Sequence, residues 1–156
     1  IKDRFIPIIS DKVQKLGSHV VESFIVPDDR VAIRDGVKSL LDAGADLIVT
    51  TAGLSVDPDD VTRHGIRMAG ASEMYYGAAA LPGAMFLTAY IEGVPLLGVP
   101  ACGIYHEVTI LDLVLPRILA GEQLTRKDIA SLGHGGLCLD CQQCHYPNCS
   151  FGKGAA

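Results

Sequence analysis

Hydrophobic positions along the chain follow two periods, which predict helices alternating with strands. Apolar residues recur at helical spacing over 7–16, and the mostly apolar run HVVESFIV at 19–26 predicts a strand. Asp28 or Asp29 is placed to cap a second helix through its carboxylate, and the short run DLIVTT at 46–51 is typical of a strand buried on both faces. This rhythm predicts an α/β fold in which helices cover both sides of a mostly parallel sheet.

The second half of the chain predicts further elements of both kinds. A brief helix is expected at 61–68, and two strand-like runs at 84–100 are joined by a Glu-Gly dipeptide that favours a hairpin or a tight crossover. The longest helix is expected at 104–121. Thr125, with an acidic residue three positions later, has the pattern of a capping box and predicts a last short helix.

Length and composition narrow the class of protein. The 156 residues predict one domain, assigned to 1–133, with an appendage at 134–156. The formal net charge is −5 and no stretch concentrates Lys or Arg, which excludes a nucleic-acid partner. No apolar run approaches the roughly 20 residues that span a bilayer. The chain begins at Ile1 without a signal-peptide pattern, so we expect a cytoplasmic protein with no membrane attachment.

The loop that leaves the strand at 46–51 carries the candidate chemistry. It offers the hydroxyls of Thr51 and Ser55, a glycine at Gly53 that lets a ligand approach, and several aspartates that end at Asp60 before a helix. Ligands of open parallel sheets bind at the carboxyl ends of strands, and a helix start there holds anions such as phosphate. The carboxylates suit Mg²⁺. The alternative is that Asp60 or its neighbour only caps the next helix.

The stretch DLIVTTAGLSVDPDDVT resembles the main loop of the molybdopterin-binding domain family, with Gly53, Ser55 and Asp60 on the matching positions. Four further stretches, IVPDD, LPGAMF, GVPLLGVPACG and VLPRILAG, resemble family motifs in the same order over residues 1–121. The resemblance implies a three-layer α/β sandwich. It also implies that this chain begins after the first strand of the family, so that more chain is expected upstream.

The resemblance further implies binding of molybdopterin or the molybdenum cofactor, in cofactor biosynthesis or delivery. It assigns the pterin to these residues: Thr51, Gly53, Leu54, Ser55, Asp60, Pro82, Gly83, Pro100, Cys102 and Gly103. If the chain is a catalyst, the implied reaction is adenylyl or molybdenum transfer, with Asp60 holding Mg²⁺. Molybdoenzymes or other cofactor-biosynthesis proteins are the implied partners, and a homo-oligomer is possible.

Departures from the family pattern favour binding over turnover. Ala52 replaces the first glycine of a pair, Ala84 and Met85 replace a Lys-Pro, and the second glycine loop reads Pro-Ala-Cys-Gly. The alternative function is therefore a redox- or metal-responsive module that senses the cofactor without chemistry. A nucleotide-pyrophosphate hydrolase is a third hypothesis, because a related fold supports that activity. Cys102 is either a small apolar filler or a soft ligand near the metal of the pterin.

The remaining cysteines cluster in the tail at C-x2-C-x2-C-x4-C spacing, as Cys138, Cys141, Cys144 and Cys149. They stand too close together to staple distant parts of the fold, which disfavours a disulfide framework. The run is similar to bacterial iron–sulfur spacing but departs from it at the fourth cysteine, and it is cramped for zinc. A 4Fe–4S cluster, a Zn²⁺ ion and no metal at all remain open.

Overall fold

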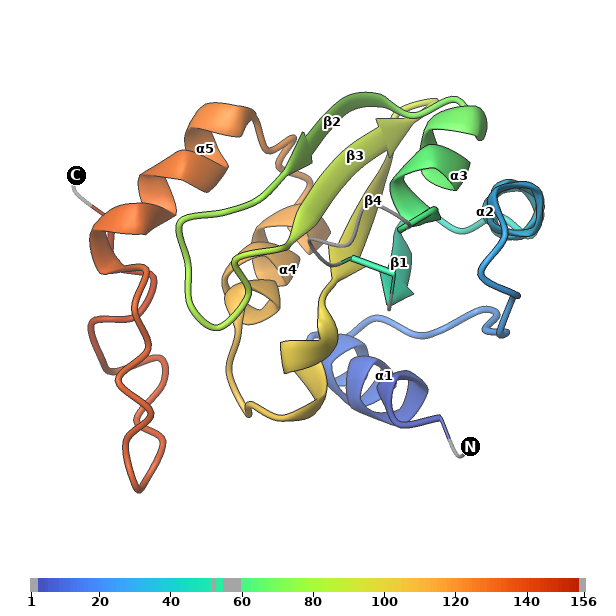
Figure 1. Cartoon of the computed structure of the whole chain (residues 1–156). Helices are drawn as coiled ribbons and strands as arrows, with labels where there is room; N and C mark the ends of the chain where they lie inside the picture. Colours follow the sequence, from blue (N-terminus) through green and yellow to red (C-terminus); the bar gives the residue numbers. More distant parts are fainter. Residues whose placement is uncertain (1–2, 52, 55–59, 155–156) are drawn as a thin grey trace.

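The computed structural model describes residues 3–51, 53–54 and 60–154. In chain order the elements are α1 (Phe5–Lys15), α2 (Arg30–Asp42), β1 (Ile48–Thr51), α3 (Thr62–Met68), β2 (Ser72–Tyr76), β3 (Leu87–Ile91), β4 (Val94–Val99), the 3-10 helix η1 (Ala101–Ile104), α4 (Ile110–Leu119), α5 (Arg126–Ser131) and the 3-10 helix η2 (Leu132–Gly135). Figure 1 shows their arrangement. No helix within the described residues is long and apolar enough to cross a membrane.

Four strands form one mixed sheet in the order β1-β4-β3-β2. β1 runs parallel to β4, whereas β3 is antiparallel to both β2 and β4. Glu92 and Gly93 form the turn between β3 and β4 with φ values of 53° and 85°, so the predicted hairpin is confirmed. The α/β class is confirmed as well. The sheet is mixed, however, and not mostly parallel as expected. Among its described strands only β1 and β4 are parallel, since the chain reverses between β3 and β4 and β2 is antiparallel to β3.

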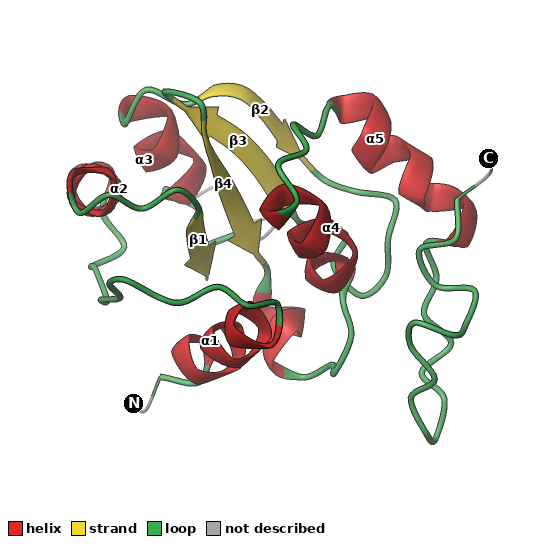
Figure 2. Ribbon diagram, turned by 180° about the vertical axis from the view of Figure 1, so that it is seen from behind, coloured by secondary structure: helices red, strands yellow, loops and turns green. Residues whose placement is uncertain are grey.

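Helices cover both faces of the sheet, which makes three layers (Figures 1 and 2). On one face, α1 and α4 pack with α5 on a core that includes Leu97 and Val99 of β4. On the other face, α2 and α3 pack on a core that includes Leu96 of β4 and Ile48 of β1. Successive residues of β4 thus enter opposite cores, as the two-residue period of a strand requires.

Local capping chemistry positions the helices as the sequence predicts. The Asp29 carboxylate accepts the backbone N–H groups of Val31 and Ala32, each at 2.9 Å, and so begins α2. Thr125 and Asp128 form the predicted capping box of α5. Capping of this kind stabilises a helix by about 1 kcal/mol, because it satisfies backbone donors that have no partner within the helix.

The strand predicted at 19–26 is wrong. The described chain there forms no strand and pairs with none. Most of its apolar side chains are exposed, up to 76% for Ile25, whereas Val26 is half-buried against the core that includes α2 and α3. A strand needs a neighbour with which to exchange hydrogen bonds, and among the described residues this segment does not pair with the open edge of β1, the terminal strand of the sheet. Apolar composition alone supplies no such neighbour.

Two other predictions differ from the structure. The long helix expected at 104–121 is interrupted, because Thr109 adopts an extended conformation and caps α4 with a second capping box. β2 was not predicted at all. Its sequence SEMYY lacks a continuous apolar run, and its register against β3 shifts between Ser72 and Tyr75.

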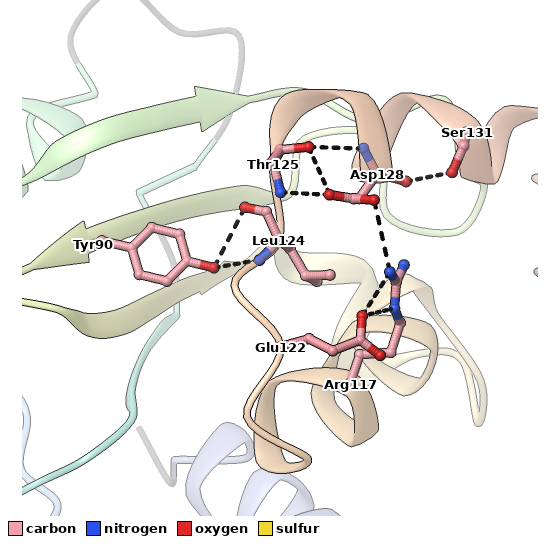
Figure 3. Close-up of polar contacts among 7 residues, drawn as sticks. All are labelled: Tyr90, Arg117, Glu122, Leu124, Thr125, Asp128 and Ser131. Carbon is pink, nitrogen blue, oxygen red and sulfur yellow. Dashed lines mark hydrogen bonds and ion pairs between the residues drawn. The ribbon is translucent and has the colours of Figure 1, made fainter.

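Polar contacts fasten α5 to the sheet (Figure 3). The buried Tyr90 hydroxyl of β3 accepts the Leu124 N–H at 2.7 Å and donates to the Leu124 carbonyl at 3.4 Å. Arg117 of α4 pairs with Glu122 at 2.7 Å and lies 3.8 Å from Asp128 of α5. The segment before α5 is therefore tied to β3, and α5 itself to α4.

The cysteine-rich tail docks on the rest of the chain at its two ends. Leu81 donates its N–H to the Gly136 carbonyl at 2.6 Å, and its own carbonyl accepts the Cys138 N–H at 2.8 Å. Phe151 is only 2% exposed. A Cβ on Gly152 would lie 2.3 Å from Leu113 of α4, so this glycine permits close contact. Between these ends, the Tyr146 hydroxyl donates to the Asp112 carbonyl of α4 at 3.0 Å, so the middle of the tail contacts the domain as well.

Candidate functional site

Sheet topology brings the three loops named by the sequence to one edge. Thr51, the last residue of β1, lies opposite Val99, the last residue of β4, so the loops that follow both strands leave the same side of the sheet. Leu87, the first residue of β3, lies opposite Gly98, so the loop before β3 reaches that side too. Figure 1 shows the chain passing from β4 straight into η1 at this edge. In open α/β sheets, ligands bind at the carboxyl ends of the parallel strands, and this edge contains the carboxyl ends of β1 and β4.

In the loop after β1, a glycine makes close contact with two buried polar residues. Gly53 has a φ of 59°, and a Cβ there would lie 2.0 Å from Thr62 Oγ1 and 3.3 Å from an Asp60 carboxylate oxygen. Asp60 is 6% exposed, and its carboxylate accepts the Thr62 N–H at 3.1 Å. The N-cap of α3 is Val61, which has no side-chain capping bond, so the Asp60 bond is a local turn contact just before the helix and not the cap that the sequence offered as its alternative role. It also holds the carboxylate in one orientation. Leu54 is buried against Gly98 of β4.

An arginine and a tyrosine that the sequence did not single out lie beside Asp60. The guanidinium carbon of Arg63 is 4.3 Å from the centre of the Tyr76 ring, which is a cation–π contact. Arg63 Nε is buried and has no hydrogen-bond partner among the described residues. Burial raises the pKa of the Tyr76 phenol, the Arg63 charge opposes that rise, and the Asp60 charge adds to it. The Tyr76 phenol therefore lies within electrostatic range of both Arg63 and Asp60.

The other two loops are held by close backbone packing. Gly83 has a φ of 123°, and a Cβ there would lie 2.3 Å from a side-chain carbon of Ile110. The Pro82 carbonyl accepts the Ile110 N–H at 3.1 Å, which joins this loop to the first residue of α4. In the loop after β4, Pro100 accepts the Gly103 N–H at 3.0 Å. Both loops are set by contacts that leave no room for a side chain at their glycines.

Cys102 is half-buried in the loop after β4. Burial raises the pKa of its thiol, and two backbone hydrogen bonds only partly oppose this shift. A raised thiol pKa disfavours the thiolate, which is the form that ligates metal. Without a bound metal, Cys102 is therefore held as a neutral thiol, and its two expected roles both stay predictions. Ser55, by contrast, lies outside the described residues, as do Ala52 and the aspartates at 57 and 59.

The tail cysteines do not converge. Cys138 and Cys149 are half-buried, Cys141 and Cys144 are exposed, and all are free thiols. Within residues 3–51, 53–54 and 60–154, no three His, Cys, Asp or Glu side chains are grouped so as to hold a metal ion. The 4Fe–4S cluster and the Zn²⁺ ion of the tail therefore stay predictions from cysteine spacing.

Two hollows lie away from Asp60. One, of 460 Å³, separates β2 and the loop after it from α5 and is lined by Tyr75, Tyr76 and Arg126 among others. The second, of 650 Å³, lies between α1 and α4 and reaches Gly103 of the loop after β4. Neither includes Thr51, Gly53 or Asp60 in its lining, so the candidate site is defined by its convergent loops rather than by cavity size.

The fold and this edge define a class: a three-layer α/β domain whose glycine-containing loops meet at the carboxyl ends of β1 and β4. The sequence matches the model of a family described as probable molybdopterin binding domain over residues 1–120. The chain belongs to that family.

Individual relatives agree with this assignment. A molybdopterin adenylyltransferase from Pyrococcus furiosus is 33% identical over 76 residues, which cover 49% of this chain and 44% of that protein. Among solved structures, the molybdopterin biosynthesis MoeA protein from Pyrococcus horikosii matches 77% of this chain and 29% of its own, with a TM-score of 0.61 and 22% identity. The protein CinA, of unknown function, from Thermoplasma acidophilum matches 66% of this chain and 80% of its own, with a TM-score of 0.58 and 17% identity. At these identities the two structures show a shared fold. The chain spans less than half the length of the curated relative.

Proposed function

We propose that this chain binds molybdopterin or the finished molybdenum cofactor in cofactor biosynthesis or delivery. The observation that carries the proposal is the convergence of three loops at one edge of the sheet, where the registers of β1, β3 and β4 place them together. Each of these loops has a described glycine in a close-packed position, at Gly53, Gly83 and Gly103. At each of these points the protein's own side chains take up the space where a Cβ would stand, so the glycines let the loop backbones pack closely and hold them in place at this edge.

The described residues fit an anionic pterin. Gly53 packs directly against Thr62 and Asp60, which fixes the main chain of the first loop, and Arg63 offers a buried Nε–H that lacks an acceptor among the described residues. A buried donor of this kind stabilises a bound oxyanion more than a solvent-exposed donor does, because it has no water to lose when the ligand binds. Asp60 is the carboxylate that would hold Mg²⁺, an ion that prefers oxygen ligands and commonly meets phosphates through one or two carboxylates.

Adenylyl transfer or molybdenum transfer is the finer form of the proposal. It rests on Asp60, which is buried and oriented by the Thr62 N–H, and on the adenylyltransferase relative. The alternative is a sensing module that binds the cofactor without turnover. The absence of Lys and Arg from the sequence of the Pro82 and Pro100 loops favours this alternative, because transfer to a nucleotide requires more positive charge than cofactor binding alone.

A binding experiment tests the proposal directly. The chain is mixed with molybdopterin without oxygen, separated by gel filtration and analysed by mass spectrometry. We expect one equivalent of pterin to travel with the protein. Recovery of protein without pterin at micromolar concentrations of both would refute the binding function.

A second arm separates catalyst from carrier. ATP turnover in the presence of molybdopterin is measured for the unmodified chain, for Asp60→Asn and for Asp46→Asn, which alters an exposed aspartate just before β1. Transfer predicts that turnover is lost in Asp60→Asn and retained in Asp46→Asn. Turnover that survives Asp60→Asn contradicts the role given to Asp60. Pterin binding with no turnover in any of the proteins supports the sensing module.

A further inference from the structure

Arg63 is positioned to supply positive charge at the candidate edge. The sequence has no Lys or Arg at 51–62, 77–86 or 100–104, the segments that contain the three loops. Arg63 follows the first of these segments at once, as the second residue of α3. Arg63 is therefore the first cationic residue that follows the first loop in the sequence, and it is available to a phosphate that binds at this edge.

The neighbours of Arg63 fix its guanidinium in place. Its carbon lies 4.3 Å from the Tyr76 ring centre, so the guanidinium is placed over the face of the ring. Tyr76 belongs to β2, whose partner β3 is part of the central sheet. An arginine stacked in this way loses less side-chain entropy when it binds a ligand, because its guanidinium is already held in one orientation.

The buried Nε–H points to a missing acceptor. Most buried donors in proteins are hydrogen-bonded, and leaving one without a partner costs about 1–3 kcal/mol. Arg63 Nε is buried and has no partner in the described part of the chain. Nε and one terminal nitrogen of a guanidinium form a pair of parallel donors that matches two oxygens of a phosphate or carboxylate. A ligand oxyanion would satisfy this donor.

We propose that Arg63 binds the phosphate monoester of the ligand through Nε–H and an adjacent terminal N–H, with Tyr76 as a positioning residue. The inference deepens the proposed function and rests on it. Asp60 and Arg63 both lie near enough to Tyr76 to shift the pKa of its phenol, so a carboxylate and a guanidinium are present in the same part of the edge. A Mg²⁺ ion held by Asp60 would leave the Arg63 charge available to the phosphate.

The test uses inorganic phosphate as the probe and the whole chain with Mg²⁺ present. Binding is followed by titration calorimetry and by the NMR signal of the Arg63 Nε–H group. We expect phosphate to shift this signal in the unmodified chain. Arg63→Gln should weaken phosphate binding by at least about tenfold, because it removes a charge-assisted pair of hydrogen bonds. Arg63→Lys should fall between the two, because it keeps the charge but lacks the planar fork.

Arg67→Gln is the matched control. Arg67 lies one turn further along α3 and is exposed, so its removal lowers the net charge equally without touching the edge. Tyr76→Leu should weaken phosphate binding, and Tyr76→Phe should restore it because the aromatic ring returns. Urea unfolding of each variant shows whether it is folded. The NMR readout on the unmodified chain still decides the question if Arg63→Gln does not fold.

Three results would overturn the inference: no movement of the Arg63 signal with phosphate, equal affinity in Arg63→Gln and the unmodified chain, or an equal loss in Arg67→Gln. The last of these would mean that phosphate binds only through general charge. The proposed function fails separately. A chain that binds phosphate through Arg63 but retains no molybdopterin would uphold the inference and refute pterin binding. Pterin binding with the same affinity in Arg63→Gln and the unmodified chain would uphold the proposed function and refute the inference.

Discussion

Phe151→Ala is expected to release the cysteine-rich tail while the sheet stays folded. Phe151 is 2% exposed, and the next residue, Gly152, lies close against Leu113 of α4. Removing a buried phenylalanine side chain costs about 3–5 kcal/mol, from lost burial and the cavity that remains. The cost falls on tail docking first, because the tail is held to the domain by a small set of local contacts, among them the Tyr146 hydroxyl bonded to the Asp112 carbonyl at 3.0 Å.

Amide hydrogen exchange measures this release residue by residue. The reporters are the Cys138 N–H, bonded to the Leu81 carbonyl at 2.8 Å, and the Gly152 N–H, bonded to the Gly135 carbonyl at 2.8 Å. A loss of about 3 kcal/mol in docking corresponds to roughly 100-fold faster exchange at both. Amides of β3 and β4 should exchange at their former rates. The increase in exchange rate cannot exceed the value set by the free energy with which the tail docks, even if the substitution costs more than that.

Leu139→Ala is the control, since Leu139 belongs to the same tail and is 70% exposed. It should leave every reporter unchanged. Unaltered exchange of Cys138 in Phe151→Ala would show that the phenyl group does not hold the tail. Equal acceleration throughout β3 and β4 would show instead that tail and sheet unfold as one unit.

Three further predictions concern the site, the sheet and the tail. Gly53→Ala should weaken pterin binding by at least about tenfold and lower the free energy of unfolding by about 1–3 kcal/mol, because the new Cβ would clash with Thr62 Oγ1 and the backbone has positive φ. Ligand titration measures the first effect and urea unfolding the second. An unchanged pterin affinity would contradict the close packing at Gly53. Tyr90→Phe should lower the free energy of unfolding by about 1–3 kcal/mol because the buried Leu124 N–H loses its acceptor, and a change below about 0.5 kcal/mol would be inconsistent with that bond. Iron, sulfide and zinc analysis of protein purified without oxygen should find a metal bound by the tail. Zinc without a visible chromophore would refute the iron–sulfur cluster, and protein that contains neither iron nor zinc would refute both metal sites.

The candidate site was partly predictable because its glycines and aspartate lie in short local patterns. Gly53 and Asp60 stood out from such a pattern and Gly83 from the resemblance to the family, and all three lie on loops of one edge. Arg63 was not, because nothing in its own neighbourhood distinguishes it from a surface arginine. Its partner Tyr76 comes from β2, a strand that the sequence did not predict.

Local chemistry by itself determined the helix caps and the turn. Asp29 begins α2, Thr125 and Asp128 begin α5, and the Glu-Gly dipeptide reverses the chain between β3 and β4. Each depends on atoms within about four residues, so the sequence displays all the participants.

Tertiary structure decided everything that needs a distant partner. Residues 19–26 have strand-like composition yet find no strand to pair with, whereas SEMYY forms β2 because β3 offers it hydrogen bonds. The tail lies against Leu81 and α4, although it is separated from Leu81 by more than fifty positions in the sequence. Strand pairing, cation stacking and tail docking are long-range contacts, and their free energy exists only once the chain has brought both partners together.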